Sequence, residues 1–405
     1  MTGAPSPAGN EPHAGFIPPP YPYDRLTAVA ALAERHPGGM VDLSIGTPCD
    51  PPPDAVVAAL GSSGTERGYP KSVGSPGFRA AAAGWMTRRF GLDIDPAHIA
   101  ACVGTKEMVA STAWFLRLRH PGRDTVLAPA TAYPTYALSA QLAGCRAVAV
   151  PEIPGGGMDL RRISEEDAAR ALLLWVNSPS NPTGALTDLG QAAEWGQARG
   201  VPVFSDECYA EFTWSTWPPP TILHHGVDGL VAVHSLSKRS NMAGVRVGFY
   251  AGDAEIVTFL SEVRQHAGLM VPGPVQAAAV AALDDDVHVE DQRGRYRRRL
   301  DRLAQVLGAC GLDAPAPDGT FYLWVPVPDW AAAAGRTESR DGAWVLAEVL
   351  AQAAGMLVSP GEFYGQAGPS HVRIAMVQPD DRIELVAERL AGSSDPRLSG
   401  SLAAI

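Results

Sequence analysis

The stretch Ser235-Leu-Ser-Lys-Arg-Ser-Asn-Met-Ala-Gly-Val-Arg-Val-Gly248 joins two apolar runs of the chain, residues 230–233 and 245–251. Short apolar runs flanked by polar segments that contain glycine are typical of buried strands. The part between the two runs is polar and contains Gly244, so it predicts a loop. Lys238 is therefore expected in a loop between two buried strands.

The residues around Lys238 suit a phosphate group. Ser235 and Ser237 place hydroxyls before the lysine, and Arg246 follows eight residues after it. Hydroxyls and an arginine form a plausible phosphate site, because the guanidinium is a planar fork of charged donors. A lysine beside such a site is a candidate Schiff-base nucleophile. The motif alone is weak evidence, since lysines in polar loops are usually just solvated.

The composition is that of an ordinary globular protein, with 405 residues, 46% of them hydrophobic and 19% charged. The net charge of −11 argues against nucleic acid and against anionic membrane surfaces as partners. Five cysteines without a CxxC pair predict no disulfide framework and no zinc site, which fits a cytoplasmic location. There is no secretory signal pattern. The basic run at residues 293–302 is expected to be a solvated helix face.

Strand-like and helix-like segments alternate through the first two thirds of the chain. This alternation is the signature of βαβ units and of a mostly parallel sheet covered by helices, with ligands beyond the carboxyl ends of the strands. The helical segments are 78–90, 106–118, 136–142, 189–199 and 254–266, and the strands are 99–103, 125–128, 146–150, 172–176 and 201–205.

The pattern changes after residue 283. A long helix at 287–307 precedes separated strands and helices, which predicts a smaller α+β domain. The expected organisation is an extended or disordered Pro-rich arm (1–23), a segment packing with the small domain (24–45), a large domain (46–285), a small domain (286–392) and a tail (393–405). The later strands are 321–325, 356–358 and 372–375, and the later helices are 344–354 and 380–390.

Two motifs follow early strands. At Gly104, Thr105 and Lys106 a strand gives way to a helix, whose free N–H groups form an anion site, although many helix starts hold nothing. Tyr133 follows the next strand and could stack on a planar ring, but aromatic residues in loops more often belong to a satellite core.

Two further motifs follow central strands. The segment Asn177-Ser-Pro-Ser-Asn-Pro-Thr-Gly184 contains two X-Pro bonds, which predict a rigid, possibly cis turn that presents the Asn181 amide. Asp206 ends a strand expected in mid-sheet, where a buried carboxylate must be paired or neutral. A pyridinium nitrogen is a suitable partner, and Tyr209 could donate to a phenolate oxygen, whereas the alternative for Asp206 is a turn cap.

Arg373 lies inside an otherwise apolar strand and needs an anionic partner. A substrate carboxylate held by both guanidinium arms would satisfy this requirement. An internal salt bridge would satisfy it equally well, so both interpretations stay open.

Taken together and in this order, these motifs resemble those of the fold-type I pyridoxal phosphate aminotransferases of class I/II, from residue 41 to residue 390. The resemblance implies that Lys238 forms the Schiff base with pyridoxal 5'-phosphate and shuttles the substrate proton. It implies that Asp206 pairs with the pyridine nitrogen, that Tyr209 and Asn181 bond the ring oxygen, and that Tyr133 stacks on the ring.

The resemblance also implies the remaining contacts. The phosphate would be held by Ser235, Ser237, Arg246 and the backbone of Gly104, Thr105 and Lys106. Arg373 would take the substrate α-carboxylate with help from Asn181 and the Gly46 backbone. Tyr69, in Gly68-Tyr-Pro-Lys-Ser-Val-Gly74, matches the family tyrosine that reaches the phosphate of a neighbouring subunit, which implies a homodimer.

Within this family the sequence most resembles the actinobacterial succinyldiaminopimelate aminotransferases of lysine biosynthesis, through segments such as Asp42-Leu-Ser-Ile-Gly-Thr-Pro48. The expected function is amino-group exchange between an amino acid, N-succinyl-LL-diaminopimelate or a similar dicarboxylic one, and 2-oxoglutarate. Departures such as Gly319-Thr-Phe-Tyr322 motivate an alternative, a secondary-metabolism enzyme that uses the same quinonoid for elimination, γ-substitution or carbon–carbon bond formation. The sequence leaves open which cation, Arg25, Lys71, Lys106 or Arg239, would bind a distal carboxylate.

Overall fold

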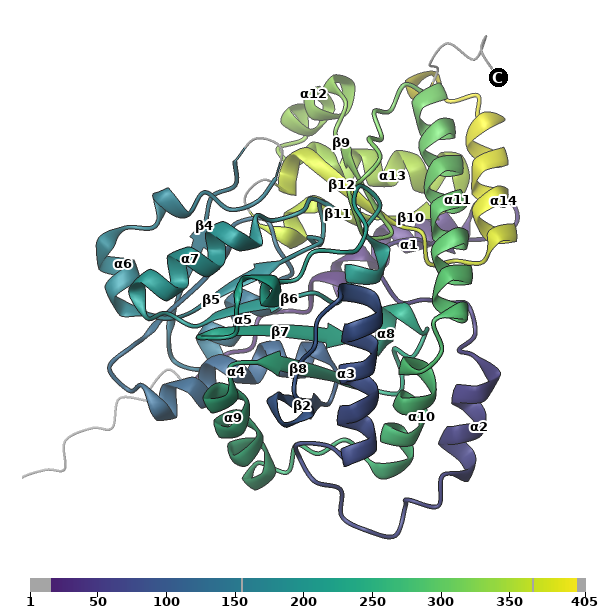
Figure 1. Ribbon diagram of the computed structural model, residues 1–405. Coiled ribbons are helices and arrows are strands. Elements are labelled where there is room, and N and C mark those ends of the chain that lie inside the picture. Colours follow the sequence, from purple (N-terminus) through teal and green to yellow (C-terminus); the bar gives the residue numbers. More distant parts are fainter. Residues whose placement is uncertain (1–15, 154–155, 366–367, 399–405) are drawn as a thin grey trace, which may run out of the picture.

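The computed structural model describes residues 16–153, 156–365 and 368–398, and a seven-stranded sheet runs through its centre (Figure 1). The strand order is β2-β8-β7-β6-β5-β3-β4. Strand β8 is antiparallel to both of its neighbours and the other pairs are parallel, so the sheet is mostly parallel as predicted. Its strands are β2 (Ile99–Cys102), β3 (Thr125–Pro129), β4 (Arg146–Val150), β5 (Ala171–Asn177), β6 (Val203–Asp206), β7 (Leu230–Ser235) and β8 (Gly248–Gly252).

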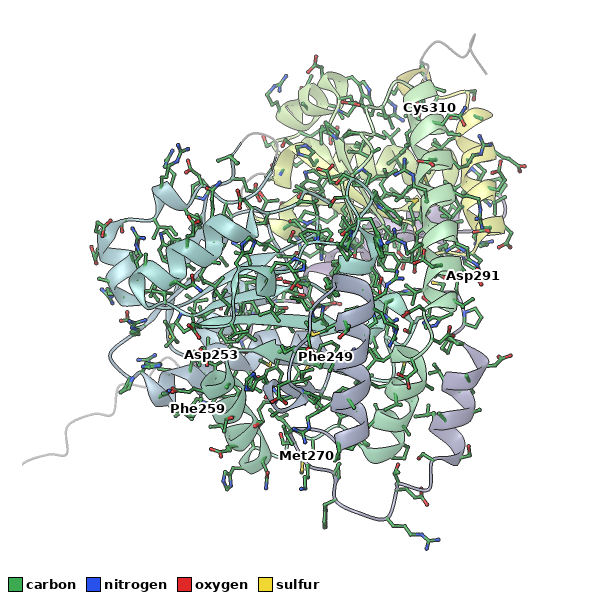
Figure 2. The ribbon with its side chains drawn as sticks, viewed as in Figure 1. Phe249, Asp253, Phe259, Met270, Asp291 and Cys310 are labelled. Carbon is green, nitrogen blue, oxygen red and sulfur yellow. The ribbon has the colours of Figure 1, made fainter. Side chains whose placement is uncertain are left out.

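Helices cover both faces of this sheet, because alternate residues of each strand point to opposite sides. On β2, Ala101 packs in one apolar cluster and Cys102 in the other. Phe249 of β8, labelled in Figure 2, meets Trp85 edge-on with ring centroids 5.7 Å apart. One face carries α3 (Pro76–Phe90), α7 (Leu189–Arg199) and α10 (Gly273–Leu283), and the other carries α4 (Thr105–Arg119), α5 (Thr135–Leu142) and α9 (Ala254–His266).

A third apolar cluster surrounds two smaller sheets. The antiparallel sheet has the order β11-β12-β9, and β1 pairs in parallel with β10, so the start of the chain lies beside its last third. The elements of this part are α1 (Thr27–Glu34), β1 (Val41–Asp42), α11 (Val287–Ala309), β9 (Tyr322–Pro326), α12 (Asp329–Thr337), α13 (Gly342–Ala354), β10 (Met356–Leu357), β11 (Ser359–Pro360), β12 (His371–Ala375) and α14 (Asp380–Ala391).

The observed elements lie close to the predicted segments, with three differences. Lys238 belongs to one helical turn, α8 (Leu236–Arg239), rather than to a loop. Helices α2 (Asp54–Ser62), α6 (Glu165–Arg170) and α12 were not among the predicted segments. No helix was predicted over the residues of α10 either. Helix α10 forms there because its proline stands in the first turn, where a missing N–H costs no hydrogen bond.

The domain boundaries given above remain a prediction. Residues 1–15 of the arm and 399–405 of the tail lie outside the described residues. In the described part of the chain, no helix has the length and apolar character needed to cross a membrane.

The basic run at residues 293–302 is not simply a solvated face. Arg299 is buried and forms two hydrogen bonds with the Asp50 carboxylate, at 2.7 and 3.0 Å. Burial pushes the pKa of Asp50 upward, but hydrogen bonds from Arg299 and Gln292 outweigh this and hold the pKa below its ordinary value. The prediction of a solvated face is therefore wrong at Arg299, which joins α11 to a loop about 250 residues earlier.

We expect Arg299→Met to lower the free energy of unfolding by about 3 kcal/mol, because the buried Asp50 carboxylate loses both hydrogen bonds from Arg299 and keeps only Gln292 at 2.8 Å and the more distant Arg295 at 3.7 Å. The loss should be largest above the pKa of Asp50 in the unfolded chain and should vanish as pH falls through its lower pKa in the folded protein. Urea unfolding at several pH values measures this loss in the free energy of unfolding. Arg298→Met is the matched control, since the Arg298 side chain is 67% exposed, and an equal loss in both variants would contradict the prediction.

Candidate active site

A cavity of about 330 Å³ lies where β5, β6 and β7 end, beside the antiparallel sheet. Ligand sites in parallel sheets are expected at this edge. The predicted site residues that line it are Gly46, Thr105, Lys106, Tyr133, Asn181, Asp206, Tyr209, Ser235, Ser237, Lys238, Arg246 and Arg373.

Lys238 extends from α8 to the wall of this cavity. Its ammonium group donates a hydrogen bond to the Gly46 carbonyl. Loss of hydration lowers the pKa of Lys238 to about 8, so the amine is more readily neutral than an exposed one. The chain has only two other lysines, Lys71 and Lys106, and Lys71 is exposed outside the cavity. Of the three lysines, Lys238 alone is half-buried, whereas Lys71 and Lys106 are exposed.

Asp206 stands at the carboxyl end of β6, in the middle of the sheet as predicted. Its carboxylate accepts hydrogen bonds from the Tyr136 hydroxyl at 2.9 Å and from the Cys208 N–H at 3.2 Å. Burial raises the pKa of Asp206, and these two bonds oppose the rise. The carboxylate faces the cavity with no cation bonded to it among the described residues, so it can receive a cationic group there.

The N-terminus of α4 forms one end of the cavity. Gly104 precedes the helix with φ +79°, and the first-turn N–H groups have no partner within the helix. Glu107 fixes this turn, because its carboxylate accepts from the Val103 N–H at 3.2 Å and receives two bonds from Arg264 at 2.6 and 2.7 Å. This end of the cavity is therefore a rigid anion site.

Arg246, in the loop before β8, closes the same end. The Arg246 guanidinium packs against Gly104, where an added Cβ would meet it, and the φ of +79° at this position favours glycine. Arg246 also donates to the Ala243 carbonyl at 2.8 Å, which orients the side chain. Ser235 and Ser237 line the cavity, and the Ser235 hydroxyl accepts from the Ser237 N–H at 3.1 Å.

Asn181 is held by the predicted proline turn. The peptide bonds before Pro179 and Pro182 are both cis. The Asn181 N–H donates to the Asn177 side chain at 2.8 Å, and the Asn181 amide oxygen accepts from Arg373 at 2.8 Å. The turn thus couples the end of β5 to β12.

Arg373 is buried in β12 and lines the cavity. It donates to the Ser44 carbonyl at 2.6 Å and to the Tyr23 hydroxyl at 3.2 Å, and the Tyr322 and Tyr364 rings lie 4.1 and 4.7 Å from its guanidinium carbon. No carboxylate of the described residues pairs with it. The interpretation as an internal salt bridge is therefore wrong, and the guanidinium can receive an anion from the cavity.

The other predicted residues are placed as follows. Tyr133 lines the cavity near Lys106, whose ammonium lies 5.9 Å from its ring centroid. The Tyr209 hydroxyl is bonded to the Tyr322 hydroxyl at 2.8 Å. Tyr69 is fully exposed and does not line the cavity of its own chain.

Sequence reasoning missed four tyrosines of the cavity region. Tyr136 binds Asp206, Tyr21 and Tyr23 come from the Pro-rich segment before α1, and Tyr322 begins β9. The stretch that contains Tyr133 also contains Tyr136, and Tyr322 falls in a segment noted as unusual, but neither pattern shows which group the hydroxyl reaches.

The fold is that of an α/β protein in which one cavity brings together a lysine, a helix N-terminus, a buried carboxylate and a buried arginine, an arrangement typical of an enzyme active site. The sequence matches the family described as aminotransferase class I and II over residues 38–390. The chain belongs to this family and is an aminotransferase.

Three known proteins illustrate the relationship. The probable aminotransferase Rv1178 of Mycobacterium tuberculosis is 42% identical over 381 residues, which cover 92% of this chain and 85% of that protein. The 4-dedimethylamino-4-oxo-anhydrotetracycline transaminase OxyQ of Streptomyces rimosus is 40% identical, with 92% and 99% covered. The solved structure of N-succinyldiaminopimelate aminotransferase from M. tuberculosis is 27% identical, with a TM-score of 0.78 and 90% and 96% covered.

Proposed function

We propose that this aminotransferase binds pyridoxal 5'-phosphate through Lys238. It moves an amino group between a dicarboxylic amino acid, N-succinyl-LL-diaminopimelate or one similar to it, and the 2-oxoglutarate–glutamate pair in ping-pong exchange. The observation that carries the proposal is one cavity that holds Lys238, the Asp206 carboxylate and the Arg373 guanidinium together. These are the groups that an amine-transferring cofactor and a carboxylate substrate require.

The residues present fit the cofactor. The helix N-terminus at Gly104, with Arg246 against it, suits a phosphate dianion. Asp206 offers a buried carboxylate that lacks a cation, which suits a protonated ring nitrogen. Family members use pyridoxal phosphate, which supplies an electron sink when it is bound.

The side chains of the protein orient the substrate and move its proton. Lys238, with a pKa lowered to about 8, provides a neutral amine and a group that takes and returns the proton at the substrate Cα. Arg373 and Asn181 fix the α-carboxylate, and thereby decide which bond of Cα stands in the reactive orientation. Asn181 and Arg373 are both buried, and Lys238 is half-buried.

Lys106 is the cation best placed for a distal carboxylate. It lines the cavity, and its ammonium lies 5.4 Å from the centroid of the Tyr21 ring. Arg25 is paired with Glu362 at 2.6 Å, and Arg239 is buried with bonds to Glu211 at 3.4 Å and to the Ala282 carbonyl at 2.7 Å. Lys71 does not line the cavity.

We expect Lys106→Met to raise KM for dicarboxylic substrates about tenfold or more, because an uncharged side chain cannot offset the second carboxylate. For a monocarboxylic amino acid such as alanine, kcat/KM should change about threefold or less. Initial rates with glutamate and alanine measure both, with Lys71→Met as the control. An equal loss for the two substrates would contradict the role of Lys106.

The proposed enzyme is a homodimer in which Tyr69 completes the phosphate site of the neighbouring subunit. A fully exposed tyrosine outside its own cavity supports this, because a large exposed ring is a common interface residue. A cytoplasmic location fits the five unpaired cysteines.

A second candidate function is transamination of a ketone in secondary metabolism. The 40% identity to OxyQ, whose name describes a transaminase acting on an anhydrotetracycline ketone, favours it. The tyrosines Tyr21, Tyr23 and Tyr322 give the cavity an aromatic wall that would suit a flat substrate. Elimination, γ-substitution or carbon–carbon bond formation is the more distant alternative.

The deciding experiment mixes the purified yellow protein with a panel of amino donors, including glutamate and N-succinyl-LL-diaminopimelate, and follows its visible spectrum. Bleaching with release of a keto acid establishes transamination and ranks the donors. Colour changes without keto acid would favour the alternative chemistries. A protein that binds no pyridoxal phosphate would contradict the proposal.

A further inference from the structure

Tyr322 contacts three groups of the site at once. It begins β9, is 1% exposed and lines the cavity. Its hydroxyl lies 2.8 Å from the Tyr209 hydroxyl, and its ring lies 4.1 Å from the guanidinium carbon of Arg373. A Cβ added to Gly46 would lie 1.9 Å from its hydroxyl, so the hydroxyl reaches the backbone that accepts from Lys238.

We propose that Tyr322 is a positioning residue that links the two halves of the site. Its hydroxyl donates to Tyr209 and so directs the Tyr209 proton toward the cofactor, and its ring holds Arg373 in place for the substrate carboxylate. Because Tyr209 needs a bound cofactor to act on, this role of Tyr322 rests on the proposed function.

The direction of the hydroxyl bond follows from counting protons. A phenol has one proton to donate, so Tyr209 can donate either to Tyr322 or to a ligand in the cavity, but not to both. If Tyr322 donates, the Tyr209 proton is free for the ligand. The 2.8 Å distance between the two hydroxyls allows either direction. Because the proposed function has Tyr209 donate to the ligand, Tyr322 is the donor within the pair.

The ring contact follows from the burial of Arg373. This guanidinium has no carboxylate partner among the described residues, and its Nε has no hydrogen-bond partner. An aromatic face stabilises a cation that is removed from water. The Tyr322 ring therefore compensates part of the missing counter-charge and limits the orientations of the guanidinium before a substrate arrives.

The hydroxyl is tested by the colour of the protein loaded with pyridoxal phosphate, titrated with pH. A bond donated by Tyr209 stabilises negative charge on the ring oxygen, and the bond from Tyr322 strengthens that donation. We expect Tyr322→Phe, which keeps the ring, to raise the pH midpoint of the colour change by about half a unit. Tyr364→Phe is the matched control, because Tyr364 also faces Arg373 but its hydroxyl is bonded to Tyr23 at 2.9 Å.

A double-mutant cycle separates this role from a general structural effect. If Tyr322 acts through Tyr209, then Tyr322→Phe should not shift the midpoint further in a Tyr209→Phe background. A midpoint that does not move in Tyr322→Phe, that moves equally in Tyr364→Phe, or that moves equally in the Tyr209→Phe background would overturn the assignment of the hydroxyl.

The ring is tested by binding of glutarate, a dicarboxylate without an amino or keto group, to the loaded protein by calorimetry. We expect Tyr322→Phe to bind it within about twofold of the unmodified protein, and Tyr322→Leu to bind it about tenfold more weakly. Equal binding by Tyr322→Leu would overturn the role of the ring. If Tyr322→Leu does not fold, Tyr322→Phe decides the question, because it retains the aromatic face. Tenfold weaker glutarate binding by Tyr322→Phe would then overturn the role of the ring. An unmodified protein that takes up no cofactor would overturn the proposed function and, with it, the role of Tyr322.

Discussion

An alanine at position 238 is expected to abolish transamination, with kcat lowered about 10⁴-fold or more while the fold is kept. In the proposed function Lys238 supplies both the amine that holds the cofactor and the base that moves the Cα proton, so one substitution would remove two functions. Burial lowers its pKa to about 8, so about a tenth of the amine is neutral at pH 7, far more than for an exposed lysine. Steady-state rates with glutamate and 2-oxoglutarate measure the loss.

The small number of lysines makes the assignment unusually direct to check. Borohydride reduction of the loaded protein fixes the cofactor to the lysine with which it has condensed, and only Lys71, Lys106 and Lys238 are available. Peptide masses should show the modification at Lys238 alone. Lys71→Ala, at an exposed position outside the cavity, should keep the rate of the unmodified protein. Wild-type rates in Lys238→Ala, or modification at Lys106, would contradict the assignment.

The sequence predicted those parts of the site that stand at the ends of strands. Asp206, Asn181 and Lys238 each follow a short apolar run, and parallel strands bring their carboxyl ends to one edge of the sheet. Arg373 was found for another reason, because a cation within an apolar strand requires an anion. In each case a polar residue ends or interrupts an apolar run, and this is visible in the sequence without knowledge of the fold.

The parts that sequence reasoning missed have no such interruption. Tyr136 and Tyr322 lie in apolar surroundings, where a tyrosine is normally a core residue, and only the fold shows that their hydroxyls reach Asp206 and Tyr209. The burial of Arg299 was not predicted for a similar reason. Its neighbours on α11 are basic, and its partner Asp50 is remote in sequence. Pairing over such distances depends on how the elements pack.

Replacing Asp206 by asparagine is expected to lower kcat about 10³-fold, the second largest loss. An amide has almost the same shape but cannot carry the negative charge that stabilises a protonated ring nitrogen, so the electron sink weakens. The amide oxygen can keep the bond from the Tyr136 hydroxyl while the bond from the Cys208 N–H is lost, which costs about 1 kcal/mol and should leave the fold intact. Single-turnover rates with glutamate, together with the dissociation constant of pyridoxal phosphate, separate the chemical step from loss of the cofactor.

Glu207 provides the matched control, because it is the next residue along the chain and is also a buried carboxyl group. Its side chain accepts from the Ile222 N–H at 2.8 Å and does not line the cavity. Burial raises the pKa of Glu207 to about 7, so a neutral glutamine changes little there. We expect Glu207→Gln to keep kcat within about threefold. A comparable loss in both variants would mean that Asp206 acts by supporting the strand rather than by its charge, and an unchanged rate in Asp206→Asn would remove it from the catalytic site altogether.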